Sequence, residues 1–247
     1  MSITHKNFIT LETVDSTNNY AMALVQKRRI HSEIAVFSKE QTAGKGRRGK
    51  QWISNRGENI ILSVAIPMQW LSISRQFEIS VAAALSCCAL FEDIILANLF
   101  IKWPNDIFIN DSKAGGILIE NLIHGKFWQW CVIGMGLNIN QEKFELENPA
   151  TSLKKITGKN FEVIQLAQKL YEIVLQKVEN LKRGQFNKML VEYNDRLYAR
   201  GKMVALQKQN IHFQTRIEGV SSAGELITRD AIERRFVFDE IIFKGLV

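Results

Sequence analysis

Hydrophobic and polar positions follow alternating strand-like and helix-like spacings in the first part of the chain. Runs rich in β-branched and aromatic residues predict strands at 7–14, 33–41 and 59–66. Residues 15–29 begin with helix-capping side chains and continue at helical spacing. Residues 75–94 are largely apolar and predict a helix that is buried on most sides.

The pattern changes twice further along the chain. Short strands separated by turn signals predict a meander over 100–139, and helical spacing over 161–198 is interrupted at Gly184. After residue 199, β-like segments recur about every eight residues and predict a small barrel. We therefore expect an α+β fold: a larger domain at 1–199 with a central mixed or antiparallel sheet and helices, and a small β domain at 200–247.

Composition narrows the class of protein but does not identify its ligand. Hydrophobic residues make up 46% and charged residues 23% of the chain, as in ordinary soluble globular proteins. The net charge of +7 fits an anionic ligand, an acidic partner or nucleic acid. The three cysteines have no ligand-like spacing, which argues against disulfides and zinc, and no signal peptide or membrane-length apolar run is evident. We expect a reducing, cytoplasmic location.

The loop AGKGRRGKQW, residues 43–52, contains two overlapping nucleotide-binding patterns. It spells G-x-G-x-x-G and also G-x-x-x-x-G-K. Both motifs need a helix directly after the loop, but a turn and a strand follow here, and Gln51 stands where a P-loop has Ser or Thr. Four cations interleaved with glycines remain, and they suit a phosphate or a carboxylate. A solvated basic turn or a nucleic-acid patch is the open alternative.

Four other segments carry polar side chains that their predicted local structure does not require. KWPND, residues 102–106, sets polar groups in a rigid turn after a strand. Lys113 precedes a glycine pair at the start of a strand, where a ligand or backbone can approach closely. DSTNN, residues 15–19, has more polar groups than a helix cap needs, and Asn138 ends a predicted strand.

Taken together, these motifs resemble one family. DSTNN, QTAGKGRRGKQW, KWPND, SKAGGILIE and GMGLNIN, in this order over residues 15–140, resemble the biotin protein ligases (biotin–[acetyl-CoA-carboxylase] ligases). The resemblance implies a class II synthetase-like catalytic domain and an SH3-like C-terminal domain. It also implies an enzyme that forms biotinyl-5′-AMP from biotin and ATP with Mg²⁺, and then transfers biotin to a lysine of a carboxylase carrier domain.

The resemblance also assigns roles to residues. It places catalytic groups at Lys113 and Arg47, and a hypothesis from the rigid turn adds Asp106, as the group that engages the acceptor lysine. The expected biotin contacts are Ser16, Thr17, Asn18, Gln41, Lys45, Gly46, Arg47, Lys113, Gly115 and Gly116. The expected nucleotide contacts are Arg48, Trp52, Lys102, Asn105 and Asn138, with no metal-binding cluster of protein side chains.

Some features depart from the family or leave alternatives open. Lys45 stands where the family's best-known form has Arg, and lysine lacks the planar guanidinium fork. About seven residues precede the first predicted strand, so we expect no N-terminal helix-turn-helix domain, no repressor function and no sequence-specific DNA binding. The resemblance is compatible with a homodimer. Rival interpretations are a lipoate or octanoate ligase or transferase of the same fold, and a non-catalytic nucleotide or nucleic-acid binder.

Overall fold

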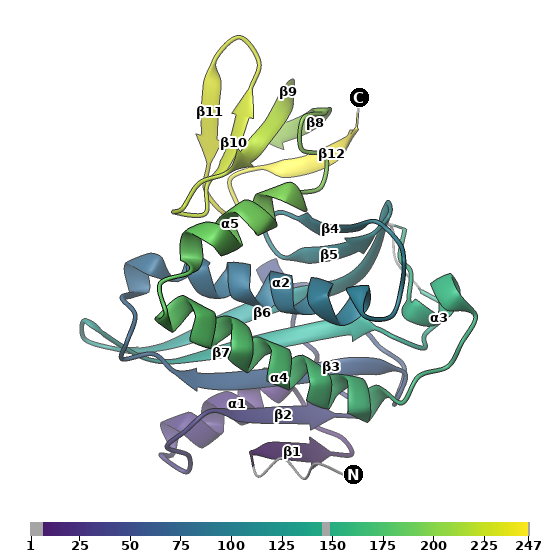
Figure 1. Ribbon diagram of the computed structural model, residues 1–247, viewed down its shortest axis with the longest axis vertical. Helices are drawn as coiled ribbons and strands as arrows, with labels where there is room; N and C mark the ends of the chain where they lie inside the picture. Colours follow the sequence, from purple (N-terminus) through teal and green to yellow (C-terminus); the bar gives the residue numbers. More distant parts are fainter. Residues whose placement is uncertain (1–6, 145–148, 247) are drawn as a thin grey trace.

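The larger part of the protein is built on a mixed seven-stranded sheet. The computed structural model describes residues 7–144 and 149–246. The strand order is β1-β2-β3-β7-β6-β5-β4; β1 and β2 are parallel and all other neighbours are antiparallel (Figure 1). The strands are β1 (Phe8–Leu11), β2 (Ile34–Ser38), β3 (Asn59–Pro67), β4 (Leu99–Lys102), β5 (Asp106–Ile109), β6 (Ser112–His124) and β7 (Phe127–Asn138).

Helices cover the two faces of this sheet unequally. On one face lie α2 (Phe77–Glu92), α4 (Val163–Lys182) and α5 (Phe186–Asp195), which form the main core with β3 side chains such as Leu62 and Val64. On the other face, α1 (Thr17–Gln26) packs on a smaller apolar cluster (Figure 1). Since α1 covers only a part of this second face, the uncovered part can form a site.

The apolar run at 75–94 forms a core helix, as its composition predicts. The helical segment Ile73–Glu92 is long and apolar enough to cross a membrane by length and composition, but 67% of its apolar 18-residue window is buried inside the fold. The buried side chains of this helix pack against the sheet, α4 and α5. Helical spacing over 161–198 is also confirmed as α4 and α5, and the break falls at Gly184, whose φ of 75° is left-handed. The short helix α3 (Leu153–Thr157) has no counterpart in the predicted elements.

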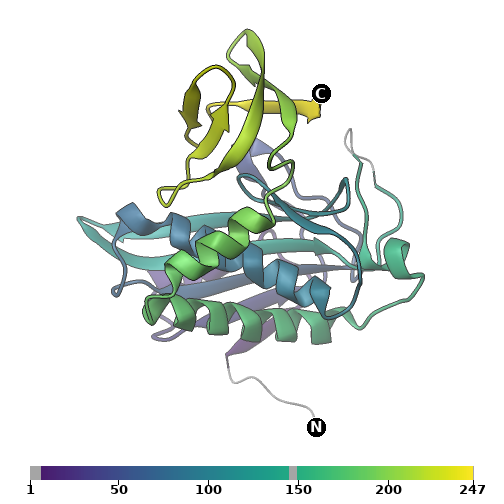
Figure 2. The ribbon, with the colours of Figure 1, turned by 45° about the horizontal axis from the view of Figure 1, so that its top comes forward.

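A second sheet of five antiparallel strands lies against one end of the larger sheet (Figure 2). Its order is β11-β10-β9-β8-β12. Trp103 joins the two parts: its Nε1 donates to the carbonyl of Gly224 at 2.9 Å, and its ring packs on Phe238. The strands are β8 (Met203–Lys208), β9 (Ile211–Val220), β10 (Leu226–Arg229), β11 (Glu233–Phe236) and β12 (Ile242–Leu246).

Candidate active site

A cavity of about 530 Å³ lies over the partly uncovered face of the large sheet. Its walls come from the first turn of α1, from β3, β6 and β7, from the loop at 43–53, and from the turn at 237–241 of the small sheet. Gly134, Met135, Gly136 and Asn138 of β7 line it, and Gly134, Gly136 and Asn138 share one face of the strand because of its two-residue period. Its volume is within the range of small-molecule sites.

One end of the cavity is a buried hydrogen-bond network at the start of α1. Ser16 caps the helix, accepting from the amide of Asn19 at 3.4 Å. The amide and hydroxyl of Thr17 both donate to Gln41 Oε1, at 2.8 and 3.1 Å. Ser63 Oγ, on β3, lies 2.7 Å from Thr17 Oγ1 and 2.6 Å from Asn18 Oδ1. These polar groups are therefore organised by one another inside an otherwise apolar region.

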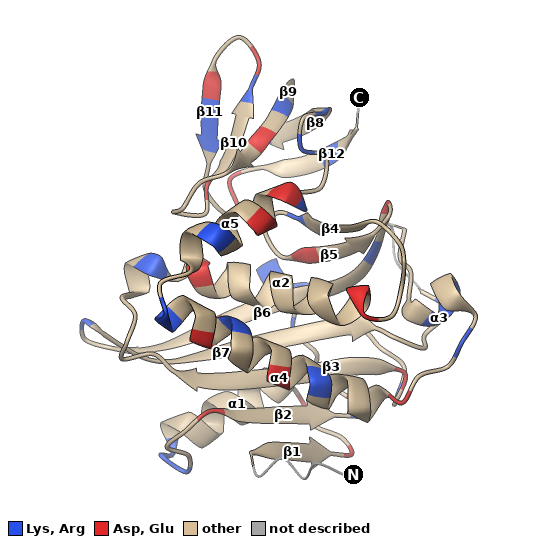
Figure 3. Ribbon diagram, in the orientation of Figure 1, with Lys and Arg blue, Asp and Glu red and all other residues tan. Residues whose placement is uncertain are grey.

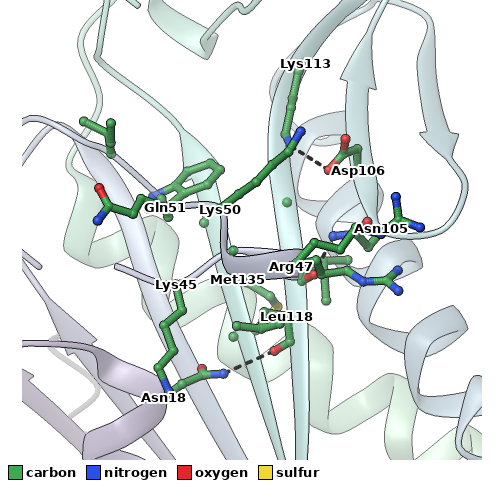
Figure 4. A pocket seen from close by; sticks show the side chains of 18 of the residues that line it. Asn18, Lys45, Arg47, Lys50, Gln51, Asn105, Asp106, Lys113, Leu118 and Met135 are labelled. Atoms are coloured by element: carbon green, nitrogen blue, oxygen red, sulfur yellow. Dashed lines mark hydrogen bonds and ion pairs between the residues drawn. The ribbon is translucent and has the colours of Figure 1, made fainter. Parts of the chain in front are cut away.

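Glu120 fixes the orientation of the Asn18 amide. Asn18 Nδ2 donates to Glu120 Oε2 at 2.8 Å and to the carbonyl of Leu118 at 3.3 Å (Figure 4 shows the second bond). An ionised carboxylate accepts but does not donate, so the amide nitrogen faces Glu120 and the oxygen faces the network. The other oxygen of Glu120 lies 3.6 Å from Lys45 Nζ, which links this network to the basic loop.

Glycines make room for the parts that converge on the cavity. A Cβ at position 134 would lie 2.4 Å from Asn18 Oδ1, and one at position 136 would lie 2.4 Å from the indole of Trp52. Neither distance is tolerable, so Gly134 and Gly136 allow α1 and the loop to lie directly on β7. Trp52 Nε1 is buried without a hydrogen-bond partner among the described residues, which leaves a donor that a ligand can satisfy.

The opposite end of the cavity carries an excess of positive charge among its described lining residues, whereas the Lys and Arg positions of the whole fold are spread over helices, strands and loops (blue in Figure 3). Lys113 Nζ lies 2.6 Å from Asp106 Oδ1 (Figure 4), and Arg47 and Arg48 both contact Asp239. Five cationic side chains line the cavity: Lys45, Arg47, Arg48, Lys50 and Lys113. Lys45 reaches Glu120 at the polar end, and the other four share the lining with two carboxylates among the described residues. This end is suited to a ligand that brings further negative charge.

The turn that precedes β5 holds Asp106 in place. Asn105 Nδ2 donates to the carbonyl of Ile117 at 2.8 Å, and the amide of Ile117 donates to the carbonyl of Asn105 at 2.9 Å. These two bonds tie the turn to β6, so Asp106 cannot move independently of Lys113 on the same strand pair.

Most residues singled out by the sequence lie together around this cavity. Two do not line it: Gly115, where a Cβ would meet the side chain of Leu137 at 2.4 Å, and Lys102. Lys102 lies in a neighbouring cavity of about 180 Å³ between the two sheets, where burial lowers its pKa and its Nζ is 4.4 Å from the ring centre of Phe243. The residues that do line the main cavity are Ser16, Thr17, Asn18, Gln41, Lys45, Gly46, Arg47, Arg48, Trp52, Asn105, Asp106, Lys113, Gly116 and Asn138.

Three residues near the cavity were not singled out by the sequence. Ser63 is a polar residue within an apolar strand, and Glu120 lies within the GGILIEN segment, so each had a local signal. Asp239 had none, because it belongs to the small sheet and reaches the loop only through the tertiary fold.

Comparisons with known proteins agree with this architecture. Residues 10–138 match the model of the biotin/lipoate A/B protein ligase family. A biotin--[acetyl-CoA-carboxylase] ligase of Paracoccus denitrificans is 35% identical over 134 residues, which is 52% of this chain and 53% of that protein. The bifunctional ligase/repressor BirA of Bacillus spizizenii is 30% identical over 161 residues, 64% of this chain and 49% of that protein. The chain thus spans about half the length of these curated relatives.

A solved structure supports the fold over nearly the whole chain. The biotin protein ligase from Aquifex aeolicus in complex with biotin and ATP superposes with a TM-score of 0.81 at 22% identity, covering 98% of this chain and 100% of that one. At this identity the likeness concerns the fold. Since the family model matches more than half of the residues, the chain belongs to the biotin/lipoate A/B protein ligase family.

Proposed function

We propose that this protein is a biotin–protein ligase. It joins biotin and ATP into biotinyl-5′-AMP with release of pyrophosphate, and then transfers the biotinyl group to a lysine of a carrier domain such as that of acetyl-CoA carboxylase. The observation that carries the proposal is the polarity of the cavity: a closed polar network at one end and clustered cations at the other. Relatives named as biotin ligases add support.

The polar end favours biotin over lipoate and octanoate as the acid in this proposal. The ureido ring of biotin has two N–H donors and a carbonyl acceptor, which can pair with the oxygens of Thr17 and Asn18 and with the amide nitrogen of Gln41. The dithiolane ring of lipoate and the tail of octanoate have no such groups. Either would leave this buried network without new partners, and a site built to form hydrogen bonds discriminates strongly against such ligands.

The basic end supplies what the activation step needs. A carboxylate and the α-phosphate of ATP repel each other, so the site must neutralise charge where they meet. Lys113 and Arg47 are placed for this task, with Lys45 and Gly46 in the same loop. We assign Arg48, Trp52 and Asn105 to the nucleotide side. Lys102 would act there only indirectly, because it faces the neighbouring cavity.

In this scheme Asn138 both supports the backbone of Lys113 and faces the nucleotide. Its Nδ2 donates to the carbonyl of Thr151 at 3.0 Å and lies 3.4 Å from the carbonyl of Lys113. Because these bonds occupy the amide nitrogen, Asn138 holds the backbone of Lys113 and leaves its oxygen free for the nucleotide.

Transfer requires a neutral amine on the acceptor lysine, and we assign the binding of this amine to Asp106. The incoming lysine nitrogen attacks the acyl carbon, the bond to the adenylate oxygen breaks, AMP leaves, and the nitrogen loses a proton as the amide forms. Asp106 borders the cavity and pairs with Lys113, so it can exchange that partner for the acceptor ammonium and accept its proton.

Magnesium belongs to this proposal as a companion of ATP. Among the described residues, no three His, Cys, Asp or Glu side chains are grouped as metal ligands, and the two cavity carboxylates are already paired with basic side chains. These residues do not form a metal site by themselves. A magnesium ion would be held mainly by the phosphates of the nucleotide.

The domain boundary and the cellular location are further parts of this proposal. We place the boundary between a catalytic domain at 1–199 and an SH3-like domain at 200–247, and we infer a cytoplasmic enzyme. The three free thiols, Cys87, Cys88 and Cys131, are all buried, which agrees with that location.

The test is a competition between acids for one carrier. An apo biotin carrier domain is incubated with the protein, ATP and Mg²⁺, together with biotin, lipoate and octanoate, and its mass is measured. We expect modification by biotin and none by the other two. Preferential loading of lipoate or octanoate would replace this proposal with the rival activity of the same fold, and binding of ATP without any modification would favour a non-catalytic binder.

A further inference from the structure

The turn between β11 and β12 brings a carboxylate from the small sheet to the basic loop. Asp239 Oδ1 accepts from Arg47 Nη2 at 3.0 Å and from Arg48 Nε at 2.8 Å. Next to it, the ring of Phe238 lies 5.2 Å from the guanidinium carbon of Arg47 and also packs on Trp103. The two arginines are therefore held by one short segment of a different sheet.

The backbone on both sides of this contact departs from the common conformations. Arg48 has φ 55° and ψ 37°, and Asp239 has φ 68°, so both are left-handed. Side chains other than glycine adopt this region at a cost in free energy, although Asp tolerates it better than most. Such residues gather at ligand clamps and switch segments. The ion pairs help to compensate for this local cost.

Asp239 differs from the other carboxylate of the cavity in the cations with which it pairs. Asp106, the other carboxylate among the described lining residues, is paired with Lys113. Within that described lining, Asp239 is thus the single counter-charge of the loop arginines. Its side chain is 52% exposed, so these pairs are weak enough to exchange for a phosphate.

We infer that Asp239 is a positioning residue. In the ligand-free protein its ion pairs hold the basic loop over the cavity. When the adenylate binds, Arg47 leaves Asp239 and pairs with the phosphate of the adenylate. Phe238 stacks on the same guanidinium and keeps it near the cavity during the exchange. The second half of this inference rests on the proposed function, whereas the anchoring of the free loop does not.

Limited proteolysis tests the anchor directly. Trypsin cleaves after the loop arginines, and mass spectrometry of the fragments identifies cleavage at Arg47 and Arg48. Asp239→Asn keeps the shape of the side chain, and Asn also tolerates a left-handed backbone. In the free protein, loss of the two ion pairs should accelerate this cleavage by about fivefold or more, since proteolysis follows the population of the open loop.

Two comparisons separate anchoring from a general loss of stability. Asp230→Asn, which changes a carboxylate paired with Arg234 in the turn between β10 and β11, should cleave like the unaltered protein. With biotin, ATP and Mg²⁺, Asp239→Asn and the unaltered protein should be equally protected. A general loss of stability would instead accelerate cleavage in both states and lower Tm.

The outcomes distinguish this inference from the proposed function. If the free loop of Asp239→Asn is cleaved at the unaltered rate, the anchor does not exist. If it is cleaved faster, but biotin and ATP protect neither protein, the anchor stands and the ligand assignment is wrong. Protection of the unaltered protein without protection of Asp239→Asn would overturn the exchange of Asp239 for phosphate.

Discussion

Replacing Glu120 by Met should weaken biotin binding and leave ATP binding largely unchanged. The substitution preserves the length of the side chain but removes the acceptor that lies 2.8 Å from Asn18 Nδ2. Asn18 is buried, and its remaining bond to the carbonyl of Leu118 is long at 3.3 Å. The amide then loses a fixed orientation, and its oxygen no longer reliably accepts from Ser63 or from the ligand.

The size of the effect depends on the kind of bond that is lost. A hydrogen bond to a charged group contributes about 1.5–3 kcal/mol, which corresponds to an increase of about 10- to 150-fold in KM for biotin. The contact with Lys45 at 3.6 Å is partly exposed and adds about 1 kcal/mol or less. Glu120→Gln can still accept a bond from Asn18, so its effect should be smaller.

The assay is pyrophosphate exchange measured as a function of each substrate. We expect KM for biotin to rise in Glu120→Met, while KM for ATP changes by about twofold or less, because the altered bond lies at the polar end. Glu12→Gln, at an exposed carboxylate paired with Lys39 and Arg56, serves as the control. An unchanged KM for biotin, or an equal rise for both substrates, would refute the idea that Glu120 orders the biotin end.

Three further predictions address other parts of the structure. Gly136→Ala should displace the Trp52 indole, with an overpacking cost of about 1–3 kcal/mol and a marked loss of exchange activity. Gly116→Ala, whose Cβ would lie at ordinary contact distances of 3.6 Å, should lower Tm far less, and an equal fall in Tm would contradict the packing argument. Asp106→Asn should form the adenylate and transfer it slowly, so unaltered transfer in single-turnover measurements would dismiss Asp106 from that step. Burial raises the pKa of Cys88 from 9.0 to about 12, so the folded protein binds protons that the unfolded chain releases. The contribution of Cys88 to the free energy of unfolding is complete below about pH 9 and falls between pH 9 and 12, so Tm should be lower at pH 10 than at pH 8. Rapid modification of the native thiols at pH 8 would contradict their burial.

Local patterns in the sequence are sufficient to predict most of the elements. Spacing predicts the core helix α2 and the break at Gly184, because both depend on neighbouring residues. The turn and strand predicted after the loop at 43–52 exclude the helix-capped phosphate motifs. The structure confirms that order of elements: Gln51 forms a bridge with Lys45, and β3 is the next element.

Long-range contacts explain what could not be predicted. Glu120 meets Asn18 across 102 positions, and Asp239 meets Arg48 across 191, so neither pair leaves a local pattern. The family resemblance assigns Lys102 to the nucleotide contacts, whereas its side chain faces the aromatic residues between the sheets. Adjacency along the chain does not specify which side of a strand end a side chain occupies.

The most direct test of the central claim is ATP–pyrophosphate exchange with and without biotin. The protein is incubated with ATP, Mg²⁺ and labelled pyrophosphate, and the label that enters ATP is measured. The account predicts exchange that requires biotin and is not supported by lipoate or octanoate. Exchange that is absent with biotin, or that proceeds equally well with lipoate or without any acid, would contradict it.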